Sequence, residues 1–338
     1  MPGLLRIKGT IDIAQFWPDG TSDADTSKIK VTVDADSFSF AADRVHFKKT
    51  TVFNEALVRG ASNKKLIDTH SRVTVRLQGI DAPELHYRAA ALKMGRPEVT
   101  DPKRKAYNEA NKIERRQYLA ETATIALAKK LKSISSPEVK CEALSLVDHP
   151  YEVVDTYGRF VANIRVGTGL ATDLNVWLTQ EGWAYPTFYS SMENEEIEAF
   201  LDAMKTGKKK KKRVWSYYSL NTSKFEAGLV YREHEEPDPD ADHGPILMPK
   251  LFRRQLAWKM EKKAKVFSGN FKEFLARSPD ECYELADFLK SGPHTAKTRR
   301  LAEFMKGTKF TLQPQELVFR EKFSTVVDPN GKKIEDFF

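Results

Sequence analysis

Three short segments of the sequence carry the side chains that cleavage of a phosphodiester bond requires. They are residues 23–26 (Asp-Ala-Asp-Thr), 75–84 (Val-Arg-Leu-Gln-Gly-Ile-Asp-Ala-Pro-Glu) and 155–159 (Asp-Thr-Tyr-Gly-Arg). Cleavage needs a base to activate the attacking water and positive charge to neutralise the phosphoryl oxygens in the transition state. Carboxylates of the first two segments can act on water or hold a cation, and arginines of the last two fit phosphate bidentately. Together the segments predict chemistry on phosphodiesters.

The second segment predicts how its charged residues are presented. Residues 73–78 alternate apolar with polar side chains, which is typical of a half-buried strand, so we expect Arg76 to point away from the core. Gly79 and Pro83 break this strand. Glu84 follows Asp81 by three residues across the proline turn, so the strand and the turn can present both carboxylates to one site.

In this order, the motifs resemble those of the thermonuclease, or staphylococcal nuclease-like, family. The family pattern continues with L-N and E-G-x-A, which the sequence supplies at residues 174–175 and 181–184. The resemblance covers residues 7 to 218. It implies an α+β fold with an OB-like, five-stranded β-barrel and packed helices, and an endonuclease that hydrolyses DNA or RNA with little sequence preference and depends on Ca²⁺.

The resemblance also implies a role for each motif residue. The implied catalytic residues are Arg76 and Arg159, which would grip the phosphate, and Glu84; the implied metal ligands are Asp25, Asp81 and the backbone carbonyl of Ala82. Hard carboxylate and carbonyl oxygens suit Ca²⁺. Whether Glu84 is the base or orients the water stays open. Other aspartates compete with Asp25 as the first ligand, namely Asp12, Asp19, Asp23 and Asp34.

Two positions differ from the family pattern. Ala24 replaces the usual central glycine of the acidic loop at residues 23–26, so the resemblance does not imply the geometry of this loop. Thr156 stands where some members carry a lysine that contacts the nucleotide, so the resemblance does not imply the phosphate affinity of those members.

Aromatic and basic side chains near these motifs predict nucleic-acid contacts. Tyr157, Phe188 and Tyr189 are candidates for stacking on a base. A basic run could bind the DNA backbone and release counterions, or it could be a solvated helix face or resemble a nuclear-import signal. Its members are Lys208, Lys209, Lys210, Lys211, Lys212 and Arg213.

Composition narrows the class of protein. The net charge of +8 favours a polyanionic partner, although it does not distinguish nucleic acid from an acidic membrane. Cys141 and Cys282 are far apart, so we expect two reduced, partly buried thiols, and the histidines form no zinc-binding motif. The sequence shows no signal peptide and no membrane-spanning run, which leads us to expect a cytoplasmic protein without membrane contact.

The length of 338 residues predicts two domains. We expect a nuclease domain at 1–218 with insertions near 41–71 and 85–112, an acidic, proline-containing linker at 219–245, and an accessory domain at 246–338. Helical patterns make us expect this last domain to be mainly α-helical; they lie at 246–266, 270–276, 279–290 and 294–305. Its basic residues, such as Arg253 and Arg254, could contact DNA or keep the domain soluble.

Two other functions remain open at this stage. One is a nucleic-acid-binding module that keeps the barrel but does not cut; the presence of two arginines, Arg76 and Arg159, and two carboxylates, Asp81 and Glu84, argues against it. In the other, the C-terminal domain binds a protein partner and delivers the nuclease to it.

Overall fold

The computed structural model describes most of the chain, and its residues form two compact units. The described residues are 3–31, 38–42, 45–48, 57–59, 64–147, 150–233, 235, 238, 241–322 and 324–334. Unit 1 comprises residues 1–80, 124–178 and 321–338, and unit 2 comprises 81–123 and 179–320. This division does not coincide with the linker that we expected at 219–245.

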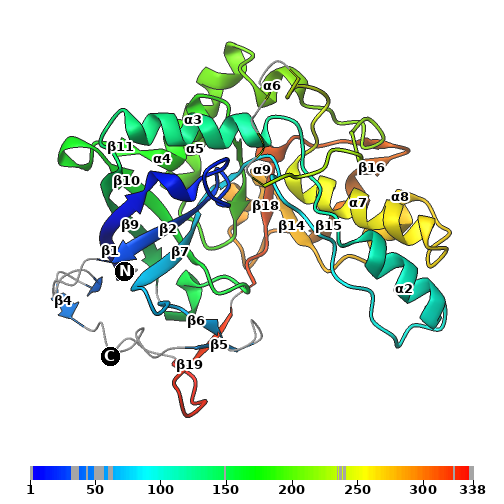
Figure 1. Cartoon of the computed structure of the whole chain (residues 1–338), viewed down its shortest axis with the longest axis horizontal. Coiled ribbons are helices and arrows are strands. Elements are labelled where there is room, and N and C mark those ends of the chain that lie inside the picture. Colours follow the sequence, from blue (N-terminus) through cyan, green and yellow to red (C-terminus); the bar gives the residue numbers. More distant parts are fainter. Residues whose placement is uncertain are drawn as a thin grey trace. The chain divides into compact units, whose positions relative to one another are not determined.

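Unit 1 is built on a closed barrel of five strands (Figure 1). These strands are β1 (Gly3–Asp12), β2 (Thr26–Val31), β7 (Arg72–Leu77), β9 (Glu138–Val147) and β10 (Phe160–Val166). Strand β1 pairs antiparallel with β2 and β9, and β2 pairs antiparallel with β7. Strand β10 closes the barrel by pairing parallel with β7 and antiparallel with β9. The predicted OB-like barrel is therefore confirmed.

Alternating burial explains why these segments form barrel strands. In β7 the side chains of Val73, Val75 and Leu77 are buried, while the side chains between them are partly exposed. Strand β10 shows the same alternation from Phe160 to Val166. The inward side chains fill the barrel with apolar surface removed from water, so the polar side chains between them are left on the outer face.

Shorter elements extend the barrel of unit 1. They are β3 (Phe38–Ala42), β4 (Val45–Lys48), β5 (Leu57–Arg59), β6 (Lys64–Lys65), β11 (Thr172–Asp173), β19 (Thr325–Val327), and the 3₁₀ turns η1 (Ile13–Gln15), η2 (Pro150–Val153) and η3 (Thr168–Leu170). Strands β3 and β4 form a hairpin on β1, and β5 pairs with both β6 and β19. The expected insertion at 41–71 thus contains short strands in its described part; the rest of it lies outside the described residues. Strand β8 (Ile80–Asp81) and helices α3 (Ala120–Lys132) and α4 (Leu174–Gln180) have residues in both units.

Unit 2 combines helices with short strands. The helices are α2 (Asp101–Ala110), α5 (Asn194–Lys209), α6 (Val214–Tyr217), α7 (Pro249–Lys263), α8 (Phe271–Ala276) and α9 (Leu285–Ser291). The strands and 3₁₀ turns are β12 (Tyr185–Pro186), β13 (Phe188–Tyr189), β14 (Glu281–Glu284), β15 (Arg299–Arg300), β16 (Met305–Lys306), β17 (Lys309–Phe310), β18 (Leu317–Phe319), η4 (Leu301–Phe304) and η5 (Pro314–Glu316). A four-stranded sheet has the order β13-β18-β14-β15.

This sheet adds strands to the C-terminal part, which we expected to be mainly α-helical. The segment 279–290 begins as β14 and only then becomes α9. The segment 294–305 contains β15 and η4 in place of the expected helix. Short apolar runs fit a helix and a strand equally well, and here pairing with the distant strand β18 decides for the strand.

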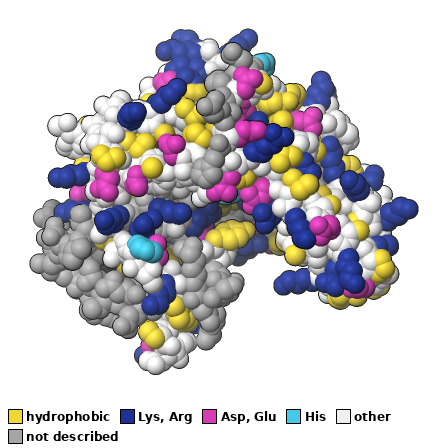
Figure 2. Space-filling view, in the orientation of Figure 1, with side chains coloured by type: hydrophobic (Ala, Val, Ile, Leu, Met, Phe, Trp, Pro, Cys, Tyr) yellow, Lys and Arg dark blue, Asp and Glu magenta, His cyan; other side chains and the backbone are white. Residues whose placement is uncertain are grey.

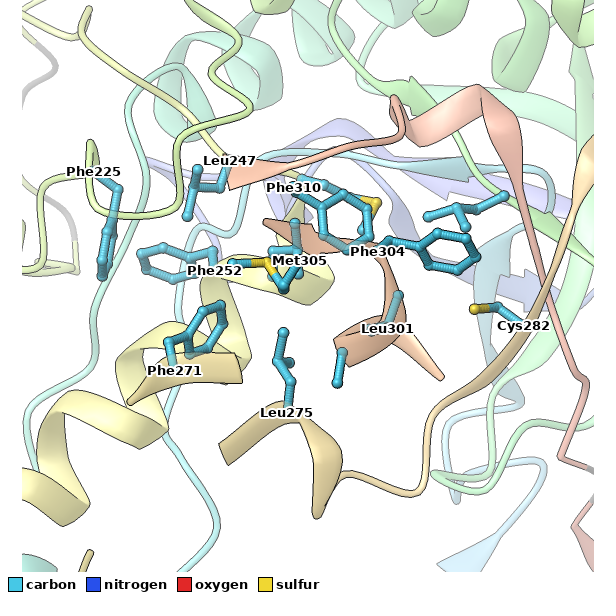
Figure 3. Close-up of a cluster of buried hydrophobic side chains, with 14 of the residues drawn as sticks. Phe225, Leu247, Phe252, Phe271, Leu275, Cys282, Leu301, Phe304, Met305 and Phe310 are labelled. Atoms are coloured by element: carbon cyan, nitrogen blue, oxygen red, sulfur yellow. The ribbon is translucent and has the colours of Figure 1, made fainter. Parts of the chain in front are cut away.

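Helix α7 and its neighbours form the main core of unit 2. The buried side chains of this core come from α7, α8, β14, η4 and the strands that follow, and Figure 3 shows several of them, including Phe252, Phe271, Leu275 and Phe310. Helix α7 begins with Pro249 in its first turn, where a missing backbone N–H costs nothing. Leu251, Phe252 and Leu256 bury one side of the helix in this core.

The segment expected to be a linker makes buried contacts within unit 2. The carboxylate of Asp242 accepts hydrogen bonds from the backbone N–H groups of Leu119 (3.0 Å) and Thr122 (3.2 Å), at the start of α3. It also pairs with Arg116 at 2.8 Å. A carboxylate at the N-terminus of a helix accepts hydrogen bonds from the unpaired N–H groups there and interacts favourably with the helix dipole. These interactions hold the chain around Asp242 in place.

The two cysteines are buried and unbonded, in agreement with the expectation of reduced thiols. Burial raises the pKa of both the Cys141 and Cys282 thiols to about 12, so neither thiol ionises readily. Across the described part of the chain, no helix has the length and apolar character needed to cross a membrane.

Candidate active site

The acidic loop and strand β7 bring Asp25 and Arg76 to neighbouring positions in unit 1. The backbone carbonyl of Asp25 accepts a hydrogen bond from the N–H of Leu77 (2.9 Å), which ties the loop to the end of β7. Thr26 pairs with Arg76 across the β2–β7 ladder and donates a hydrogen bond from its hydroxyl to Asp25 Oδ1 (3.2 Å). Arg76 is partly exposed, as its place in the alternating strand predicts.

A tight turn around Asp155 presents Arg159 in the same unit. Asp155 Oδ1 accepts hydrogen bonds from the backbone N–H groups of Tyr157 (2.9 Å) and Arg159 (3.0 Å). Its Oδ2 accepts from Arg159 Nε and lies 2.7 Å from Arg159 Nη2 as well. Gly158 adopts φ +77°, a conformation that glycine allows without strain. The remaining nitrogen, Nη1, donates to the Thr26 hydroxyl at 3.4 Å.

Unit 1 therefore gathers Asp25, Thr26, Arg76 and Arg159 around one end of β2. Sequence reasoning assigned no role to Asp155, although a carboxylate four residues before an arginine was a usable signal. Asp155 binds both the backbone of the turn and the guanidinium of Arg159, and these hydrogen bonds fix the orientation of the guanidinium plane. Bidentate binding of phosphate needs a guanidinium with a fixed orientation. Of the competing aspartates, Asp34 lies outside the described residues.

The proline turn fixes Glu84 within unit 2. The backbone N–H of Glu84 donates to Gln117 Oε1 (3.1 Å), and its carbonyl accepts from the Gln117 N–H (2.7 Å). The side-chain amide of Gln117 in turn donates to the carbonyl of Leu247 (2.9 Å). Gln117 is buried, so these hydrogen bonds form away from water and hold the Glu84 backbone firmly. Sequence reasoning missed Gln117, because a glutamine 33 residues away carries no motif.

Arg253 of α7 contacts both predicted carboxylates of unit 2. Its Nη1 donates a hydrogen bond to Glu84 Oε1, and its Nη2 lies 3.6 Å from Asp81 Oδ2. The neighbouring Arg254 binds Asp280 through two nitrogens, at 2.7 and 3.0 Å. Both arginines that we expected to contact DNA or keep the protein soluble are thus engaged in ion pairs within unit 2.

The carboxylates of Asp81 and Glu84 have the right chemistry for a hard cation. Both direct an oxygen at one positive group, the guanidinium of Arg253. Carboxylate oxygens are ligands that Ca²⁺ prefers. No cluster of three or more His, Cys, Asp or Glu side chains with metal-binding geometry occurs within the described ranges. The carboxylate oxygens of Asp81 and Glu84 are thus of the chemical type that calcium binds, and in this structure their counter-ion is Arg253.

Residues 74–217 match the family model of staphylococcal nuclease homologues. This segment is a staphylococcal nuclease-like domain. The matched segment contains Arg76, Asp81, Glu84 and Arg159, and it supports a nuclease or nucleic-acid-binding module. It begins within β7, so Asp25 lies before it. A comparison with curated proteins found no match.

Two other motifs of the staphylococcal nuclease-like domain have structural roles. The buried amide of Asn175 donates to the carbonyls of Gln78 (2.8 Å) and Ala162 (3.2 Å) and accepts from the Ile164 N–H (3.2 Å), so it joins α4 to β10 and to the end of β7. Gly182 adopts φ +72°, and a Cβ atom there would lie only 2.7 Å from the carbonyl oxygen of Lys212.

The aromatic candidates of the staphylococcal nuclease-like domain differ sharply in exposure. Tyr157 is 71 % exposed, and its ring lies 5.5 Å from the Arg159 guanidinium, so it is open to a base. Tyr189 is partly exposed and packs near Phe319, with ring centroids 6.0 Å apart. Phe188 is 0 % exposed, so the expectation that it stacks on a base is wrong for this structure: its ring fills the core.

The basic run of the domain begins in helix α5 (Asn194–Lys209) and extends past its end. Helix α5 ends at Lys209, and Lys208, Lys209, Lys210 and Lys211 are exposed. The last two members are engaged: Lys212 pairs with Glu181 at 2.6 Å, and the Arg213 guanidinium lies 4.0 Å from the Trp183 ring. Figure 2 shows Lys and Arg side chains, together with Asp and Glu side chains, on the face in view.

Proposed function

We propose that the chain is a calcium-dependent nuclease that hydrolyses phosphodiester bonds of DNA, with RNA as a second substrate, and with low sequence specificity. The observation that carries the proposal is the set of charged residues retained in the staphylococcal nuclease-like segment, with Arg159 held by Asp155 and Glu84 by Gln117. Contacts to phosphate carry no sequence information, which is why we propose low specificity.

In this proposal, each residue has one task. Glu84 accepts a proton from the water whose oxygen forms a bond to phosphorus, while the bond from phosphorus to the leaving oxygen breaks and that oxygen takes a proton from solvent. Arg76 and Arg159 bind the phosphoryl oxygens, on which charge accumulates in the transition state. Bound calcium, held by Asp25, Asp81 and the carbonyl of Ala82, would neutralise further charge on the phosphate.

Digestion of plasmid DNA and single-stranded RNA by the purified protein tests this function, with Ca²⁺, Mg²⁺ or EDTA in parallel reactions. We expect calcium-dependent cutting by the wild type and a loss of about 10²- to 10⁴-fold in Glu84→Gln, because a base is removed without a change in shape. Glu109→Gln makes the same chemical change at an exposed position of α2 and should cut like the wild type. Full activity in Glu84→Gln would reject the assignment of the base.

A second candidate function is a nucleic-acid-binding module that does not cut. The observation that favours it is the engagement of Asp81 and Glu84 by Arg253, since a paired carboxylate is a poor base. This candidate predicts a mobility shift of DNA by the wild type, unchanged in Glu84→Gln, together with no cleavage at any calcium concentration. Calcium-dependent cleavage by the wild type would exclude it.

A further inference from the structure

Arg253 lies outside the staphylococcal nuclease-like segment, yet it contacts both carboxylates to which we assign chemistry. Its side chain is 30 % exposed, while those of Glu84 and Asp81 are only 15 % and 3 % exposed. Two carboxylates with so little access to water are costly to ionise without a nearby positive charge. The guanidinium of Arg253 supplies this charge.

Helix α7 holds the backbone of Arg253 in a fixed position. The preceding residue, Phe252, is fully buried in the core of unit 2 (Figure 3), and Leu256 packs in the same core. The following residue, Arg254, is anchored to the partly buried Asp280. Because its neighbours fix the helix while its own side chain reaches solvent, the guanidinium can leave the carboxylates by a change of rotamer, without any movement of α7.

We propose that Arg253 is a built-in counter-ion of Asp81 and Glu84 that competes with calcium for Asp81 and so sets the calcium affinity of the protein. The inference rests on the proposed function, because it takes Asp81 as a calcium ligand. Both cations need the carboxylate of Asp81, and a guanidinium beside a Ca²⁺ ion would be repelled at such short distance. Calcium therefore binds the molecules in which Arg253 has turned away, and the apparent affinity falls in proportion to their fraction.

This role differs from that of a third phosphate-binding arginine. A phosphate-binding Arg253 would strengthen binding of nucleic acid and leave calcium binding alone. A competing counter-ion weakens calcium binding, and does so in the absence of nucleic acid. Calcium titration of the protein alone separates the two roles.

The experiment is isothermal titration of Ca²⁺ into the full-length protein, without nucleic acid. Arg253→Gln and Arg253→Met both remove the charge, and the latter keeps an apolar stem for packing. If the paired state holds about nine tenths of the molecules, each variant should bind calcium with a Kd lowered about tenfold. Arg253→Lys keeps a charge and should lie closer to the wild type. Lys263→Gln removes one charge from the exposed end of the same helix and should match the wild type.

A Kd that is unchanged or raised in both charge-removing variants would overturn the proposal, as would an equal decrease in Lys263→Gln, which would indicate long-range charge alone. Thermal unfolding with and without calcium confirms that the variants are folded, and calcium should raise their Tm more than that of the wild type. Cleavage assays keep the two proposals apart. Tighter calcium binding without cleavage would reject the nuclease only, and cleavage with an unchanged Kd would reject the counter-ion only.

Discussion

At the scale of single residues, Asp155 shows how one carboxylate can prepare another side chain for phosphate. It accepts hydrogen bonds from the backbone of the turn and from the guanidinium of Arg159. Asp155→Asn keeps the shape but loses the charge, so we expect kcat/KM for an oligonucleotide to fall about 10- to 100-fold, mainly through KM, because hydrogen bonds to charged groups are worth about 1.5–3 kcal/mol.

Steady-state kinetics measures this effect, and Asp202→Asn, at an exposed ion pair on α5, is the matched control. A fall in Tm without a change in KM would show that Asp155 only stabilises the turn.

The acidic loop supports a second prediction at this scale. Asp25 lies beside Thr26 and is tied to β7, so Asp25→Ala should remove a charged ligand and leave the strand pairing intact. We expect the calcium concentration for half-maximal cleavage to rise about tenfold or more. Asp23→Ala and Asp19→Ala serve as comparisons. If Asp25→Ala has the calcium dependence of the wild type, the ligand is one of these other aspartates.

At the scale of elements, the turn between α4 and β12 depends on Gly182. Its positive φ and the 2.7 Å approach of the Lys212 carbonyl to an added Cβ both penalise a side chain, so Gly182→Ala should lower the free energy of unfolding by about 1–3 kcal/mol. Gly169 also has a positive φ, of +61°, but no atom within 4 Å of an added Cβ, so Gly169→Ala isolates the backbone effect. Urea denaturation of both variants should show the larger loss in Gly182→Ala.

Elements with strong local patterns were predictable, and those fixed by distant partners were not. The alternation around Arg76 located β7, and the motif placed Asp81 and Glu84 on a proline turn. By contrast, β14 exists because β18 pairs with it, and the pattern of residues 279–290 alone cannot reveal that partner. Phe188 was misjudged because a sequence does not show which aromatic rings face the core. Arg253 is 169 residues from Glu84, beyond any local signal.

At the scale of the whole molecule, a buried charge cluster predicts a pH dependence of stability. Burial raises the pKa of Glu121 from its ordinary value of 4.5 to about 7, with Arg116 opposing the rise and Asp242 adding to it. Between these two values the Glu121 carboxyl binds more protons in the folded than in the unfolded state, so its contribution to stability falls as pH rises from about 4.5 to about 7. We expect a loss of about 1–3 kcal/mol.

Glu121→Gln should flatten this slope in urea denaturation at several pH values, whereas Glu109→Gln at an exposed site should retain it. A wild-type slope in Glu121→Gln would assign the pH dependence to other groups.

The interleaving of the two units has a consequence for how the chain is made. Residues 321–338 belong to unit 1, where β19 pairs with β5, so the chain passes from one unit to the other four times. A ribosome that has just translated the barrel strands has yet to make the strand that completes their unit, and the whole of 179–320 must emerge first. Unit 1 is therefore expected to finish folding late in synthesis, and a nascent chain stalled before β19 should be more open to proteolysis around β5 than the released protein.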